Sequence, residues 1–211
     1  MKKSKIRALS MLLAAIVISA LMVPGVCAEK TTSVTAFYNE MGGKEVSAGE
    51  YLEIVDPDAF STLTDEQKAQ FYAMRVTVPD LTQNVAQTSA TIEATGDTRR
   101  DIIYQVVNDV DLAPIPFGIS WFANSKASSI FPDMHVTAQF FYSDDDGSSW
   151  TEIDEGSANG QSTSFVETSK MHWLPSAGHY KVASVHWGSF PPGATPSSYF
   201  IPLVTGEMPY S

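Results

Sequence analysis

The sequence predicts an all-β fold, an antiparallel β-sandwich with one short N-terminal helix. Apolar and polar residues alternate with period two over short segments, and turns rich in Gly and Pro separate these segments. Helical patterns do not alternate with the strand-like ones, which disfavours a parallel α/β fold. Roughly nine or ten short strands with this spacing are typical of a sandwich.

The first 28 residues have the order of parts of a secretory signal peptide. Basic residues between Lys2 and Arg7 precede an uncharged apolar run, and Val26-Cys27-Ala28 places small residues at the cleavage site. We therefore predict cleavage after Ala28 and a secreted or cell-envelope location. An uncleaved anchor is the alternative, although the run is shorter than the ~20 apolar residues that span a bilayer. Lipidation of Cys27 is disfavoured because Val26 precedes it.

Cleavage would leave an acidic chain without cysteine. All 24 acidic residues but only nine of the 13 lysines and arginines follow Ala28, which gives a net charge of −15. Such a surface repels nucleic acid and anionic lipid, so we expect no nucleic-acid partner and no stable membrane insertion after cleavage. Because Cys27 is the only cysteine, the mature chain can form neither disulfides nor thiolate metal sites.

Residues 29–87 are predicted to hold two strands and one helix. Thr32–Tyr38 and Val46–Val55 are rich in β-branched and aromatic residues, and we interpret both as strands. Thr64 and Gln67 have capping-box spacing, and two acids follow Thr64 in the first turn, so a helix is expected from Thr64 to Met74. This segment is either an extension or part of the following domain.

Residues 88–211 are predicted to form the sandwich domain. Asp101–Val110 carries apolar groups on both faces, which predicts a central strand. Met134–Tyr142 alternates, so we expect one buried and one wetter face, whereas Asn124–Pro132 reads as a loop. A turn with two arginines is expected at residues 96–100. The remaining strands are expected at residues 88–94, 117–122, 151–153, 161–168, 178–187 and 199–205.

The pattern Ser143-x-Asp145-x-Gly147-x-x-Trp150 resembles the Asp-box hairpin of sialidases and related β-propellers. There, Asp and Gly shape the turn and the aromatic ring packs beneath it. A propeller needs several copies at a period of about 40–50 residues, and this chain has one. The same spacing occurs in fibronectin type III-like sandwiches, so the pattern predicts a hairpin and not a family.

The stretch from Leu174 to Ala183 resembles the tyrosine-corner approach to strand F of immunoglobulin-like sandwiches. The resemblance implies that Tyr180 bonds back to the backbone and that Ala183 takes the place of a disulfide cysteine. It also implies a core tryptophan at Trp173 or Trp121. The finer prediction is thus an immunoglobulin- or fibronectin III-like antiparallel sandwich over about residues 88–205.

Motifs of catalysis are missing from the sequence: there is no G-x-S-x-G, P-loop, G-x-G-x-x-G or H-E-x-x-H pattern. His172, His179 and His186 recur every seven residues, but an odd separation on a strand points side chains to opposite faces, which disfavours zinc. Asp144, Asp145 and Asp146 crowd three carboxylates at a hairpin tip. A weak calcium site and a solvated turn are the two interpretations. We predict a non-enzymatic protein with no other cofactor.

Tryptophans are the candidate binding residues. Exposed indoles at Trp121, Trp173 and Trp187 would stack on sugar rings, whereas the alternative places these side chains in the core. Trp150 is expected beneath its own hairpin. We predict a structural or protein–protein adhesion role with other cell-surface proteins as partners. A carbohydrate-binding module with glycan partners is the alternative function.

Overall fold

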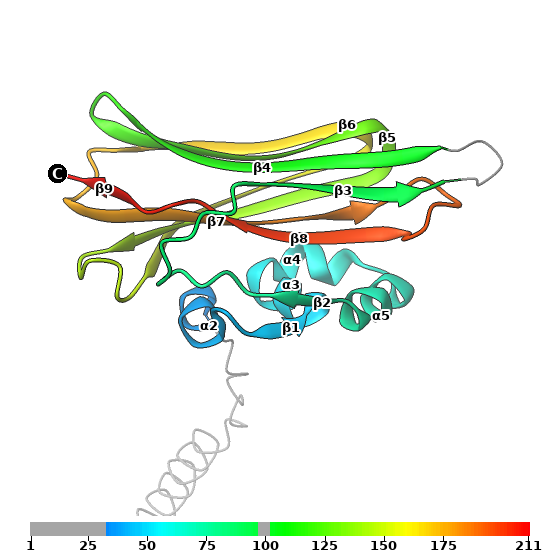
Figure 1. Ribbon diagram of the computed structural model, residues 1–211, viewed down its shortest axis with the longest axis horizontal. Helices are drawn as coiled ribbons and strands as arrows, with labels where there is room; N and C mark the ends of the chain where they lie inside the picture. Colours follow the sequence, from blue (N-terminus) through cyan, green and yellow to red (C-terminus); the bar gives the residue numbers. More distant parts are fainter. Residues whose placement is uncertain (1–32, 97–101) are drawn as a thin grey trace, which may run out of the picture. The chain divides into compact units, whose positions relative to one another are not determined.

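The computed structural model describes residues 33–96 and 102–211 (Figure 1). Within them, short helices precede a seven-stranded antiparallel sheet, so the predominantly β character of the chain is confirmed. The predicted signal peptide and most of the turn at residues 96–100 lie outside the described residues. The helices are α2 (Val34–Met41), α3 (Ala48–Val55), α4 (Pro57–Thr62) and α5 (Asp65–Ala73).

The first two segments predicted as strands are mostly helical, and those predictions are wrong. In α3, Ala48, Tyr51, Leu52 and Val55 are buried at positions i, i+3, i+4 and i+7, which is the period of a helix and not of a strand. Its start is fixed by a capping box between Ser47 and Glu50. The start of α2 is fixed by a single N-cap hydrogen bond, in which the Ser33 side chain accepts the N–H of Ala36.

Local capping also explains α5, whose prediction is confirmed. The Thr64 hydroxyl accepts the backbone N–H of Gln67 at 3.3 Å, and the Gln67 amide oxygen accepts the backbone N–H of Thr64 at 3.0 Å. Two short strands flank helices α3 to α5 and pair antiparallel, namely β1 (Glu45–Ser47) and β2 (Arg75–Thr77).

The strand order in the large sheet is β3-β4-β5-β7-β8, with β6 paired to β5 and β9 paired to β7. Because β4 lies between β3 and β5, its predicted internal position is confirmed. The strands are β3 (Ser89–Thr95), β4 (Ile103–Ile115), β5 (Gly118–Ser143), β6 (Thr151–Trp173), β7 (Gly178–Ser189), β8 (Ser198–Val204) and β9 (Met208–Tyr210).

Two strands are much longer than the sequence predicted. The predicted loop Asn124–Pro132 is part of β5, and the strands expected at residues 151–153 and 161–168 are both part of β6. The loop prediction is wrong because the polar residues there pair with neighbouring strands, and Ser125 is buried. A register shift between Lys126 and Phe131 marks where the β5–β6 hairpin bends.

The bend folds the one sheet into two stacked layers (Figure 1). The first half of β5 pairs with β4, and its second half pairs with β7. On the side away from β6, the bridges Gln87–Val204 and Thr95–Thr195 join the β3 side of the sheet to the chain around β8. The protein therefore has two sheet layers that are continuous through β5 and β6.

Two apolar cores result from this arrangement. The first lies between the two sheet layers and includes Trp121, Phe140 and Val182. The second lies between β7, β8 and the helices, which cover the outer face of the second layer (Figure 1). The predicted wetter face of Met134–Tyr142 is therefore wrong, because Gln139 and Phe141 are fully buried.

Candidate functional site

Only one of the three candidate tryptophans is accessible. Trp121 and Trp187 are each 1% exposed, whereas Trp173 is 60% exposed. The Trp121 ring lies 6.3 Å from that of Phe140 in the core between the layers. The Trp187 ring packs edge-on against Phe71 and stacks at 3.7 Å on His135. Burial leaves Trp121 and Trp187 no face for a sugar ring, so of the three candidate tryptophans only Trp173 can act as an aromatic platform.

The hairpin between β5 and β6 has the local bonding that the Asp-box pattern predicts. The Ser143 hydroxyl donates to Asp145 at 2.7 Å and accepts the N–H of Gly147 at 3.0 Å. Trp150 is buried beneath the turn, and its indole N–H donates to the carbonyl of Gly147 at 3.0 Å. Asp146 and Gly147 both have positive φ, which tightens the turn.

At the acidic tip of this hairpin, one of the three carboxylates is hydrogen-bonded within the turn. Asp145 accepts from Ser143 and also from the backbone and hydroxyl of Ser149, and these hydrogen bonds lower the pKa of Asp145 to about 2. Asp146 lies 3.4 Å from His179. In the part of the chain that the structure describes, no three His, Cys, Asp or Glu side chains are arranged to hold a metal ion. Calcium at Asp144–Asp146 stays a prediction.

A polar network without solvent access joins the two layers. The Ser125 hydroxyl donates to Asn108 at 2.8 Å, so its oxygen is left to accept from Nδ1 of His186 at 2.9 Å. Nε2 of His186 then accepts from the Ser184 hydroxyl at 2.9 Å. Burial lowers the pKa of His186 to about 3, so the imidazole is neutral. All four side chains are fully buried, so this network is structural.

Large apolar side chains are exposed together at one end of the first layer. Phe117 lies at the tip of the β4–β5 hairpin and is 76% exposed, and Leu174 follows β6 and is 80% exposed. The N–H of Leu174 donates to the carbonyl of Phe117 at 2.9 Å, which joins the two turns. Trp173 and Met171 of β6 are also exposed there. We call these four residues the apolar tip.

Both turns of the apolar tip hold strained backbone. Phe117 has φ of 63° and Leu174 has φ of 52°, in the left-handed region that glycine and asparagine favour. A bulky residue there costs about 1–3 kcal/mol and persists where the surrounding structure fixes it, often at functional sites. The neighbouring Gly118 passes beneath the Trp173 ring, where a Cβ would lie 3.4 Å from a ring carbon.

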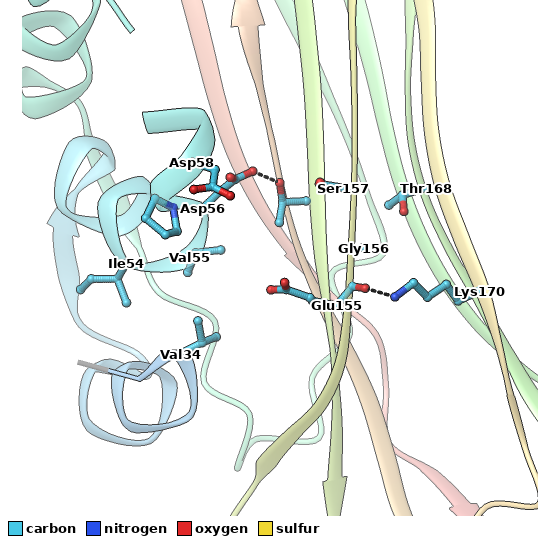
Figure 2. A pocket seen from close by; sticks show the side chains of 12 residues that line it. Val34, Ile54, Val55, Asp56, Asp58, Glu155, Gly156, Ser157, Thr168 and Lys170 are labelled. Carbon is cyan, nitrogen blue, oxygen red and sulfur yellow. Dashed lines mark hydrogen bonds between the residues drawn. The ribbon is translucent and has the colours of Figure 1, made fainter. Parts of the chain in front are cut away.

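A pocket of about 540 Å³ lies between the α3–α4 junction and β6 (Figure 2). Asp56 and Asp58 approach it from the helices, and Glu155 and Lys170 approach it from the two halves of β6. Two of these charged side chains are hydrogen-bonded within the chain. Thr137 donates to Asp56, and Lys170 donates to the carbonyl of Glu155 and to Asp154. The pocket is thus polar and lined by carboxylates.

A further carboxyl lies nearby at the start of β6. Burial, together with the negative charges of the neighbouring Glu155 and Asp154, raises the pKa of Glu152 to about 7. Its Oε1 is buried without a hydrogen-bond partner, which is consistent with a protonated carboxyl near neutral pH. Glu152 does not line the pocket beside it.

Comparison with known proteins does not extend this description. No protein-family pattern matches the chain, and no curated protein is similar to it in sequence. Across residues 33–96 and 102–211, the helices are all too short or too polar to cross a membrane.

Sequence reasoning missed the pocket and all of the apolar tip except Trp173. The signal for the tip was bulky apolar residues beside turn prolines, Phe117 after Pro116 and Leu174 before Pro175. An apolar residue in a turn has no core to enter. The pocket gave no comparable signal, because its carboxylates come from segments about 100 residues apart.

Proposed function

We propose that this protein is exported to the cell surface or medium and has a non-enzymatic structural or protein–protein adhesion role there. The observation that carries the proposal is the apolar tip. Four large apolar side chains gather at one end of the sheet, and each is more than half exposed. Contiguous exposed apolar patches on folded proteins mark interaction sites, whereas apolar residues exposed singly need no such explanation.

The shape of the tip supports a contact role. Phe117 and Leu174 belong to two turns that a backbone hydrogen bond joins, and each turn lies at the end of a long strand. The backbone therefore holds both side chains on the surface. Aromatic anchors presented on a rigid scaffold lose little conformational entropy on binding.

The finer assignment to an immunoglobulin-like sandwich stays a prediction. Its support is the bond from the Tyr180 hydroxyl to the carbonyl of Ser176 at 2.7 Å.

The adhesion proposal is tested by binding of the purified protein to isolated cell envelopes of its own organism. F117S combined with L174S should lower envelope binding at least tenfold without lowering the melting temperature, because both side chains already face water. V85S combined with I130S is the matched control, since Val85 and Ile130 are exposed elsewhere. Protease treatment of the envelopes should abolish binding. Equal binding by the tip variant and the wild type would refute the proposal.

A carbohydrate-binding module is the second proposal, and the exposed indole of Trp173 supports it. A sugar platform needs one free aromatic face, which Trp173 offers. On a glycan array, W173A should then lose binding that the F117S/L174S variant keeps. An array without any signal for the wild-type protein would eliminate this alternative.

Export itself is tested separately. N-terminal sequencing of protein recovered from the medium or the envelope should begin at Glu29. A retained Met1 or a lipid on Cys27 would contradict the predicted processing.

A further inference from the structure

β6 is an edge strand along its whole length. It pairs with β5 on one side, and no other strand in the described residues pairs with it. Its first residues are covered, because Thr35 of α2 accepts the N–H of Glu152 at 3.1 Å. Beyond Glu155 that covering ends. Edge strands with unpaired backbone groups are templates for a further strand.

The hydrogen bonds of Glu155 show which backbone groups point outward. Its N–H donates to the Asp154 side chain at 2.9 Å, and its carbonyl accepts from Lys170, so neither group faces β5. Backbone groups alternate between the two sides of an antiparallel strand. Ser157, Asn159 and Gln161 therefore also direct their N–H and C=O groups away from β5. Within residues 33–96 and 102–211, no group bonds to them.

We call the stretch from Glu155 to Gln161 the open edge. Lys170 covers the carbonyl of Glu155, but the rest of the stretch carries none of the usual protection. Native edge strands are blocked by lysine, proline or bulges. Between Glu155 and Gln161 the side chains are small and uncharged, with Gly156, Ala158 and Gly160 on the inner face. Space is also open beside it, since the 540 Å³ pocket and a neighbouring one of about 380 Å³ separate it from α4.

We propose that the open edge pairs with the open edge of a second copy of this chain, giving an antiparallel dimer through β6. In a register centred on Ala158, Ser157 lies opposite Asn159 of the second copy, and Glu155 lies opposite Gln161. Residues with outward backbone groups then face each other, as hydrogen-bonded pairs require. At Glu155 the second copy replaces the Asp154 and Lys170 side chains as hydrogen-bond partners. Seven residues are enough for an ordinary strand. The register ends before Ser162, whose φ of 49° turns the strand.

The open edge is complementary to itself, which favours a second copy as the partner. The open edge is neutral apart from Glu155, and self-pairing places this carboxylate against an amide, so no like charges lie directly opposite. On the inner face, Gly156 meets Gly160 and Ala158 meets itself, which lets the two strands approach. The acidic surface of each copy opposes association over a longer range, and salt screens that repulsion. Association should therefore tighten as salt rises.

The wild-type chain beginning at Glu29 provides the first test. Sedimentation velocity should show a monomer–dimer equilibrium that shifts toward dimer with protein and salt concentration. In hydrogen exchange, the backbone N–H groups of Ser157 and Asn159 should gain protection over the same concentration range. A monomer at every concentration, or a dimer without added protection at these two positions, would overturn the proposal.

Charge substitutions test the register. S157K combined with N159K places two pairs of like charges opposite each other and should weaken the dimer roughly tenfold. S157K combined with N159E places opposite charges in the same pairs and should restore it. T91K combined with S169K is the matched control, because both residues are exposed on strands outside the open edge.

Thermal melts identify any variant that fails to fold, and S157E combined with N159E, which again places like charges opposite each other, then replaces the lysine double variant. Equal dimerisation by the S157K/N159K variant and the wild type would refute pairing through this edge. Binding of an extended polylysine peptide at the open edge of a protein that stays monomeric would refute it too, in favour of a basic partner.

Discussion

The buried imidazole of His186 makes the stability of this protein depend on pH in a way that can be calculated. In the folded chain burial lowers the pKa of His186 to about 3, whereas an unfolded chain has an ordinary histidine pKa of about 6.5. Between these values the unfolded state binds a proton that the folded state does not bind. The free energy of unfolding therefore falls as pH falls from about 6.5 toward 3.

The size of the effect follows from the two pKa values. Each pH unit below about 6.5 lowers the free energy of unfolding by about 1.4 kcal/mol, which amounts to roughly 2 kcal/mol at pH 5. Protonating Nε2 would also remove the acceptor that the Ser184 hydroxyl uses. Above about pH 7 the contribution of His186 is constant, because both states are neutral there.

Urea denaturation at about pH 7 and pH 5, on the wild type and on H186Q, measures this effect. The glutamine amide keeps a donor and an acceptor but does not titrate, so the variant starts less stable and loses less on acidification. The wild type should lose about 2 kcal/mol more than H186Q between the two pH values. The double difference cancels the carboxylates that titrate in both proteins. Equal losses would refute a neutral, buried His186.

Two further predictions concern the cost of removing buried side chains. W121A should lower the free energy of unfolding by about 3–5 kcal/mol, whereas W173A should change it by less than about 1 kcal/mol, and thermal or urea melts decide this. Equal losses of unfolding free energy in the two variants would show that Trp173 is buried and not exposed. K181M should cost about 1.5–3 kcal/mol, because the buried Lys181 ammonium donates to the carbonyls of Leu81 and Gln83. Limited proteolysis should then cut near Gln83, while the exposed control K126M stays resistant.

The sequence by itself determined the elements whose signals are local. The helix after Thr64 begins where a hydroxyl and an amide three residues apart cap each other, and the hairpin ending at Trp150 is built from bonds within eight residues. Such interactions act within one turn of chain, so the residue pattern specifies them completely. The overall β character followed from the same kind of local pattern.

Only the tertiary structure decided where strands end and which faces are covered. Ser125 looks like a loop residue, yet it is buried because Asn108 and His186 from distant strands satisfy its hydroxyl. The outer face of β7 is covered by helices that begin more than 100 residues earlier, so Trp187 is core while Trp173, at the end of the sheet, is not. Burial depends on what packs across the sheet, and packing partners far away in the chain leave no trace in the local pattern.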